Sequence, residues 1–124
     1  MTDAQLDNSY SNNDVINHEQ FEEMRDLLEE DFNDLITTYI ADSKERIALL
    51  SAAQLAGDNA NGFEAAHAIK GSSASLGATQ LMNLAAQLQE ACRENIISQC
   101  ADLVEQADHA LALVEREINQ RLGQ

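Results

Sequence analysis

Residues 61–78 read NGFEAAHAIKGSSASLGA, and their pattern predicts a helix that is buried on one side. At about 100° per residue, one face collects small and apolar side chains, namely Ala65, Ile69, Ser72 and Leu76. A face of this kind suits close packing against other helices. His67 points almost opposite to Ile69 and Leu76. We therefore expect an exposed imidazole on a rigid helix whose other side is buried.

The sequence on both sides of this stretch also has helical patterns. Apolar residues recur at three- and four-residue spacings in further segments, which begin at Asn17, at Asp31, near Thr79 and near Ser98. The helix from Asp31 runs to about Asp58, because Gly57-Asp58-Asn59 is a helix-stopping sequence. The central helix ends at Gly77 for the same reason.

Two of these helix starts have the pattern of a capping box, in which residues three apart bond to each other's backbone. Asn17 and Gln20 form the first pair, with Ile16 before them as a hydrophobic staple. Asn61 and Glu64 form the second pair. The sequence therefore predicts that Asn17 and Asn61 cap their helices.

The apolar stripes of the long helices are regular, and the remaining faces are polar. The helix from Asp31 carries Phe32, Leu35, Ile36, Tyr39, Ser43, Ile47 and Leu50. The last two helices carry Leu81, Leu84, Ala85, Leu88 and Cys92, and then Cys100, Ala101, Val104, Ala107, Leu111, Val114 and Ile118. The chain has no proline, the commonest helix breaker. We predict an all-α fold, an antiparallel up-down four-helix bundle with a short additional N-terminal helix.

The length of 124 residues suits one domain with a single core. Residues 1–16 are rich in Asn, Asp and Ser and lack a periodic apolar pattern, so we expect a flexible acidic and polar tail. Residues 17–124 then form the folded domain.

The formal net charge is −15, from 22 acidic and 7 basic residues. Such a surface repels DNA, RNA and anionic membranes, so we expect neither nucleic-acid nor membrane partners. Cys92 and Cys100 lack the spacing of a disulfide framework or a metal site. No segment resembles a signal peptide or a membrane span. We expect a cytoplasmic protein with no cofactor or metal of its own.

The residues near His67 should leave its imidazole accessible. Lys70 places an ammonium group beside the ring, and Gly71 follows one turn after the histidine. A glycine inside a helix costs about 1 kcal/mol relative to alanine, which suggests a specific use for Gly71. Helical side chains lean toward the N-terminus, so a side chain at position 71 would lie over the imidazole. The same outer face also holds Phe63, Glu64 and Ala74.

An exposed imidazole beside a cation is suited to phosphoryl transfer. The ordinary pKa of imidazole is about 6.5, so much of it is neutral and nucleophilic near pH 7. Histidine can form covalent intermediates. A phosphoryl group in transfer carries negative charge on its oxygens, which a nearby ammonium such as that of Lys70 offsets. The combination favours a nucleophilic role for His67.

Residues 67–78, HAIKGSSASLGA, closely resemble the signature of histidine-containing phosphotransfer (HPt) domains. That signature reads histidine, any residue, a hydrophobic residue, Lys-Gly-Ser, a small residue, two further residues, a hydrophobic residue and glycine. Every fixed position matches. The resemblance extends over roughly residues 17–124, with the same order of helices, and fits a free-standing bacterial protein of this type.

The resemblance implies a role for each matching position. His67 would be phosphorylated, Lys70 would assist electrostatically and Gly71 would keep the site open. Gln89 matches a position from which some family members hydrogen-bond to the histidine. His18 and His109 match no functional position.

The resemblance also implies the partners. They would be receiver domains of hybrid sensor kinases and response regulators, which exchange the phosphoryl group between their aspartate and His67. The receiver would supply Mg²⁺, and the chain itself would be a monomeric carrier without kinase or hydrolase activity. From periodicity, Met24 and Leu28 of the first helix would join the docking face. The sequence leaves open which kinase and regulator are the partners, and the direction of transfer.

Two other function classes fit parts of the sequence. A bundle could bind and sequester a receiver without chemistry, but an accessible histidine with Lys70 and Gly71 beside it would then have no use. A metal-dependent hydrolase would need several convergent ligands. His18, His67 and His109 show no paired ligand spacing, so this class is the least favoured.

Overall fold

A computed structural model describes residues 14–123, all of whose regular structure is helical. The elements are α2 (His18–Leu28), the 3₁₀ turn η1 (Glu29–Asp31), α3 (Phe32–Ala56), α4 (Asn59–Leu76), α5 (Thr79–Arg93), the 3₁₀ turn η2 (Ile97–Gln99) and α6 (Ala101–Arg121). The predicted all-α class is confirmed for these residues. So is the short additional helix near the N-terminus.

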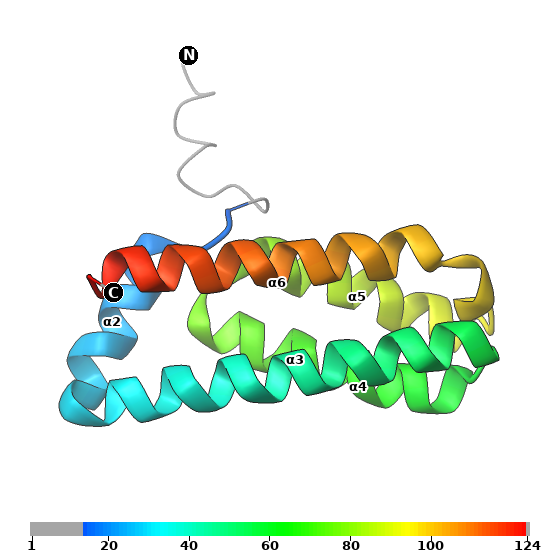
Figure 1. The fold of residues 1–124 in the computed structure, drawn as a ribbon, viewed down its shortest axis with the longest axis horizontal. Coiled ribbons are helices and arrows are strands. Elements are labelled where there is room, and N and C mark those ends of the chain that lie inside the picture. Colours follow the sequence, from blue (N-terminus) through cyan, green and yellow to red (C-terminus); the bar gives the residue numbers. More distant parts are fainter. Residues whose placement is uncertain (1–13, 124) are drawn as a thin grey trace, which may run out of the picture.

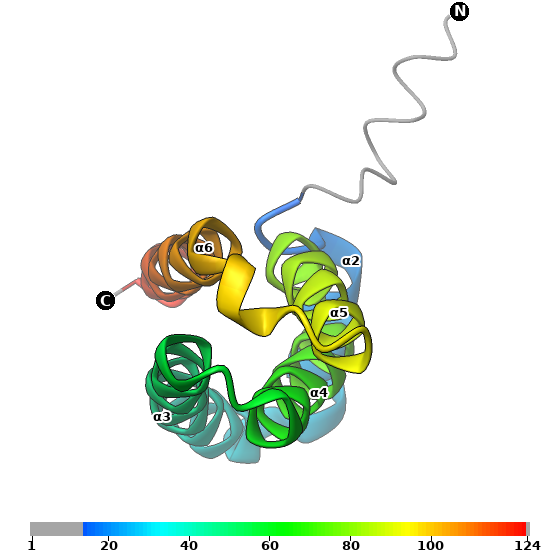
Figure 2. The same ribbon diagram turned by 90° about the vertical axis from the view of Figure 1, so that its right-hand side faces the viewer.

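Helices α3, α4, α5 and α6 form a helical bundle. Each helix contacts its neighbour, α3 with α4, α4 with α5, α5 with α6 and α6 with α3, so that the contacts close around a shared core (Figure 2). Helix α2 lies across one end and contacts α3 and α4 (Figure 1). The central helix of the sequence analysis, α4, is therefore packed between α3 and α5.

The core contains most of the residues that the helix patterns predict, with five departures. Leu35, Ser72 and Ala101 are exposed, and Leu84 and Cys100 are only partly buried. In α4 the buried serine is Ser73. Position 35 lies about 100° around α3 from Ile36, which is buried, so the buried stripe is narrower there than the spacing predicts. The fully or nearly fully buried side chains include Phe21, Leu50, Ile69, Leu81, Leu88, Ile97, Val114 and Ile118.

The cap of α2 is the predicted residue, but it does not form a reciprocal capping box. The Asn17 side-chain oxygen accepts a hydrogen bond from the Gln20 N–H at 2.9 Å. The Gln20 side chain does not return to Asn17 and instead donates to the Ala74 carbonyl at 3.1 Å. The Asn17 N–H donates to the Gly77 carbonyl at 2.7 Å. Tertiary contacts with the end of α4 thus replace half of the local motif.

The predicted cap of the central helix is wrong. Helix α4 begins three residues earlier, and Asp58 is its cap, whose Oδ1 accepts from the Asn61 N–H at 3.1 Å. The Asn61 side chain donates to the other Asp58 oxygen. These two bonds hold the pKa of Asp58 below its ordinary value, and the bond from the backbone N–H has the larger effect. An aspartate that can accept both bonds competes successfully with Asn61 for the capping position.

The last helix also begins later than predicted. The sequence indicates a start near Ser98, whereas α6 begins at Ala101 because residues 97–99 form the 3₁₀ turn η2. The Ile97 N–H donates to the Asn59 side-chain oxygen at 3.0 Å. This bond holds the 3₁₀ turn against the start of α4, and α6 begins only after the turn.

Part of the predicted tail contacts the bundle. Residues 1–13 lie outside the described residues. Ile16 is buried, Val15 packs against the core, and the Asp14 carbonyl accepts from the Gln80 N–H at 2.8 Å. Residues 14–16 therefore already belong to the packed structure.

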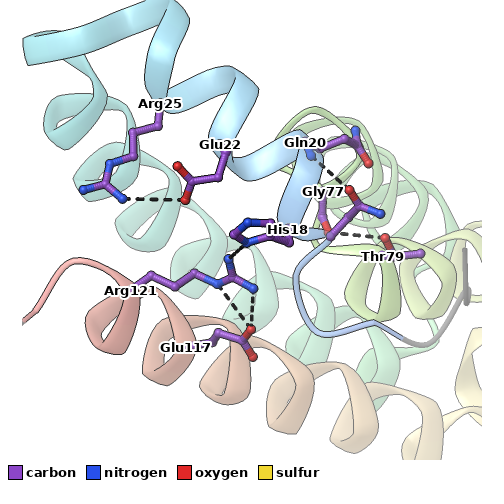
Figure 3. A network of polar contacts seen from close by, with 9 residues as sticks. His18, Gln20, Glu22, Arg25, Gly77, Thr79, Glu117 and Arg121 are labelled. Atoms are coloured by element: carbon purple, nitrogen blue, oxygen red, sulfur yellow. Dashed lines mark hydrogen bonds and ion pairs between the residues drawn. The ribbon is translucent and has the colours of Figure 1, made fainter. Parts of the chain in front are cut away.

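Two sets of contacts hold α2 in place, one with Arg121 and one with Gly77 (Figure 3). The Arg121 guanidinium lies over the Phe21 ring, 5.2 Å from its centroid, and pairs with Glu117 at 2.9 Å. Its Nη1 donates to His18 Nδ1 at 2.8 Å. The other fastening is the bond between Asn17 and Gly77. The Arg121 contacts thus join α2 to the C-terminal end of α6, and the Asn17–Gly77 bond joins the start of α2 to the C-terminal end of α4.

Gly77→Ala tests this joint between α2 and α4. Gly77 has φ +90°, and an added Cβ would lie 3.0 Å from the Gln20 Cβ and 3.3 Å from the Asn17 carbonyl oxygen. We expect the free energy of unfolding to fall by about 1–3 kcal/mol, because backbone strain and crowding add. Urea unfolding followed by circular dichroism measures it.

Gly71→Ala is the matched control, because an added Cβ at position 71 meets nothing within 4 Å. This variant should be as stable as the wild type or up to about 1 kcal/mol more stable, through helix propensity. Equal stability of the wild type and Gly77→Ala would contradict the role given to Gly77.

Candidate functional site

His67 lies in the middle of α4 with its side chain exposed. Its neighbours Ala65, Ala66 and Ile69 are all buried in the core. The predicted orientation is therefore confirmed: the imidazole projects outward from a helix whose opposite side is fixed by packing.

Gln89 on α5 contacts the imidazole directly. Its Oε1 lies 3.3 Å from His67 Nδ1, and the Gln89 side chain is 8% exposed. An amide oxygen accepts hydrogen bonds, so this contact favours the tautomer with the proton on Nδ1. In that tautomer the Nε2 lone pair is free. The structure thus brings together His67 and Gln89, which the sequence alone connected only through a family resemblance.

Gly71 leaves space beside the imidazole. A Cβ added there would meet nothing within 4 Å. A single methyl group at position 71 would therefore not lie over the ring, contrary to the expectation that any side chain there would do so. A longer side chain is needed to reach back one turn toward His67.

Lys70 is half-buried on the same helix. Among residues 14–123, its ammonium forms no ion pair, in contrast to Lys44, whose Nζ lies 3.1 Å from Glu115 Oε1. A lysine without a carboxylate partner keeps its full charge available to an incoming anion.

Two further residues complete the surroundings of His67, and neither was assigned a role from its position in the sequence. The Phe63 ring stacks on the imidazole with 5.9 Å between centroids and 6° between planes. The Arg93 guanidinium lies 5.8 Å from the Phe63 centroid, and its Nη1 is 3.2 Å from Glu90 Oε1. The spacing of four residues between Phe63 and His67 is a sequence signal for this contact. Arg93 comes from another helix, so no local spacing reveals it.

A groove of about 290 Å³ lies between α2, α3 and α4. Met24 and Leu28, which the sequence analysis placed on a docking face, both line it. Its remaining lining residues are Leu35, Thr38, Tyr39, Asp42, Arg46, Ser72, Ser75 and Leu76. The residues of α4 that line the groove, Ser72, Ser75 and Leu76, lie one to three turns after His67 on the same helix.

The described residues meet the requirements of neither a metal site nor a membrane span, and their thiols are those of Cys92 and Cys100. Residues 14–123 contain no group of three or more His, Cys, Asp or Glu side chains placed to hold a metal ion. Both cysteines are free thiols, and burial raises the pKa of Cys92. Within the same residues, no helix has the length and apolarity that crossing a membrane requires.

Comparisons with known proteins agree with this geometry. No curated protein sequence matches the chain. A solved structure, histidine-containing phosphotransfer protein B (HptB) from Pseudomonas aeruginosa PAO1, is similar with a TM-score of 0.82 and 28% identity. The alignment covers 86% of this chain and 93% of that one. The family model of the Hpt domain matches residues 34–119, and the chain therefore belongs to the Hpt domain family, whose chemistry is histidine phosphotransfer in phosphorelays.

Proposed function

We propose that His67 is the residue that carries the phosphoryl group, with Nε2 as the reacting atom. The observation that supports this most is the contact between His67 Nδ1 and Gln89 Oε1, because it leaves Nε2 as the nitrogen with a free lone pair. The exposure of the side chain lets a partner reach this atom. The open space at Gly71 removes an obstacle to its approach.

The proposed step moves the phosphoryl group from an aspartate oxygen of the partner to Nε2 of His67. The Nε2 lone pair attacks the phosphorus of an aspartyl phosphate on the partner and forms an N–P bond. The P–O bond to the aspartate breaks, and its electron pair leaves with the carboxylate oxygen. The imidazole keeps its Nδ1 proton, so the ring becomes a cation while Gln89 Oε1 accepts the hydrogen bond from Nδ1–H. The reverse of these changes returns the phosphoryl group to an aspartate.

Lys70 would stabilise the oxygens of the moving phosphoryl group, on which negative charge is spread. Its lack of an ion pair within the described residues supports this role. The chain would have no cofactor of its own, and the partner receiver domain would supply Mg²⁺. We propose a carrier without kinase or hydrolase activity.

The partners in this proposal are receiver domains of hybrid sensor kinases and response regulators. Proteins of this family interact with receiver domains. The groove lined by Met24 and Leu28 would take part in docking, since its apolar walls adjoin the helix that bears His67. The chain would act as a monomer, in which α3, α4, α5 and α6 form an antiparallel up-down bundle. The short connection between α3 and α4, residues 57–58, fits successive helices that reverse direction.

His67→Gln should abolish phosphorylation without unfolding the protein, because an exposed side chain is exchanged for one that cannot form the N–P bond. A panel of purified receiver domains, each carrying ³²P on its aspartate, provides the donors. The wild type should gain acid-labile, base-stable label and the variant none. Label on folded His67→Gln would refute the proposed site. A variant that keeps its biological function without label would favour a purely binding protein.

Lys70→Gln should slow transfer by about ten-fold, which corresponds to the loss of about 1.4 kcal/mol of transition-state stabilisation. The matched control is Lys44→Gln, which removes the same charge from α3, where Lys44 pairs with Glu115. Rapid-quench measurement of the transfer rate constant at saturating receiver separates chemistry from binding. Equal slowing of both variants would show that only net charge matters.

Gly71→Leu should keep the fold and slow transfer by at least about ten-fold, because a long side chain leans back over the imidazole. Gly71→Ala should transfer close to the wild-type rate, since its methyl group has no neighbour within 4 Å. Both rates are measured with the same labelled receiver. Transfer at the wild-type rate by Gly71→Leu would contradict the proposal that the open space at position 71 lets the partner reach the imidazole.

A further inference from the structure

The imidazole of His67 is held on two sides and open on a third. Gln89 contacts its Nδ1 edge, and the Phe63 ring lies nearly parallel to it, with 5.9 Å between centroids. Phe63 is four residues before His67 and Gly71 is four residues after it. The helix therefore presents an aromatic ring on one side of the imidazole and no side chain on the other.

The geometry of the two rings is that of offset stacking. The planes are 6° apart and the centroids 5.9 Å apart, so the two rings are parallel and displaced sideways, within the range of centroid distances that aromatic pairs favour. Because helical side chains lean toward the N-terminus, the imidazole naturally leans toward Phe63. Phe63 thus lies against the imidazole on the side of the N-terminus of α4. A rotation of the imidazole away from Gln89 would have to break this contact.

Phe63 is itself held in place from α5. Its side chain is partly buried and packs against the core. The Arg93 guanidinium lies over it at 5.8 Å, and Glu90 holds Arg93 in this position at 3.2 Å. Gln89 and Arg93 lie one turn apart on α5, so the same helix contacts the imidazole through Gln89 and its aromatic support through Arg93.

We propose that Phe63 is a positioning residue for phosphoryl transfer, an inference that rests on the proposed function of His67. Its ring keeps the imidazole within reach of Gln89, so that the proton stays on Nδ1 and Nε2 faces solvent. When Nε2 bonds to phosphorus, the ring carries a positive charge and its proton remains on Nδ1. The negative face of the Phe63 ring attracts this cation, and the contact strengthens during the reaction.

Phe63→Leu tests this role, because leucine keeps the apolar packing and removes the aromatic face. Phe63→Tyr keeps the face and serves as the conservative variant. Phe32→Leu is the control for lost aromatic packing in general, since Phe32 is buried beside Phe21 at the α2 end of the bundle. All three are compared with the wild type for unfolding free energy, receiver affinity and transfer rate constant at saturating receiver.

We expect Phe63→Leu to lower the transfer rate constant by about two- to five-fold, the factor of an exposed cation–π contact, with receiver affinity unchanged. Phe63→Tyr should transfer near the wild-type rate, and so should Phe32→Leu, whatever its stability. Wild-type transfer by Phe63→Leu would overturn the proposal, as would an equal loss in Phe63→Tyr or Phe32→Leu.

A second measurement does not depend on phosphorylation. Long-range ¹H–¹⁵N correlation spectra of the free protein, at a pH where imidazoles are neutral, report the tautomer of His67. The wild type should show mainly the Nδ1–H form, and Phe63→Leu a shift toward a mixture, with Gln89→Leu as the reference for a lost hydrogen bond. An unchanged tautomer in Phe63→Leu would overturn the positioning role, even if His67→Gln confirms the phosphorylation site.

Discussion

The close packing of α4 against α5 is the constraint on which the site depends. Gly62 is buried, and a Cβ added there would lie 2.8 Å from the Cys92 Sγ, so the two helices approach more closely than larger residues would permit. Gln89 lies about one turn before Cys92 on α5, and this approach brings its amide to His67. An exposed imidazole is therefore oriented by a helix contact that is itself buried.

A polar contact inside the core fixes α4 from its other side. The Tyr39 hydroxyl of α3 and the Ser73 hydroxyl of α4 are 2.9 Å apart, and both side chains are buried. Burial raises the pKa of Tyr39, more than its bonds to Ser73 and Ser43 lower it. The folded state thus favours the neutral phenol of Tyr39. Its contribution to the stability of the fold is therefore fully present below the ordinary tyrosine pKa of about 10 and is lost at higher pH. Specific pairing of this kind restricts α4 to one rotation about its axis.

The negative charge of the chain bears on the proposed phosphoryl transfer. A net charge of −15 disfavours the approach of a phosphoryl group, which is itself an anion. Lys70 lies on the same helix as His67, and Arg93 contacts the neighbouring Phe63 ring while pairing with Glu90. These few cations offset the field only locally. In the proposed reaction, a receiver that brings its own Mg²⁺ supplies the remaining positive charge, which makes transfer dependent on docking.

The sequence predicted the helical class, the outward direction of His67 and the end of α4 at Gly77, because all three follow from periodicity and from glycine. It misplaced the start of α4, since Asp58 and Asn61 are both good caps and only the bonds formed in the fold decide between them.

The roles of Gln89 and Arg93 could not be derived from spacing, because both reach the site from α5. Phe63 was visible at the right spacing but looked like an ordinary apolar residue, and only the parallel orientation of its ring distinguishes support of the imidazole from packing. Local patterns therefore identify a candidate nucleophile, whereas the residues that contact it from α5 depend on how two helices pack together.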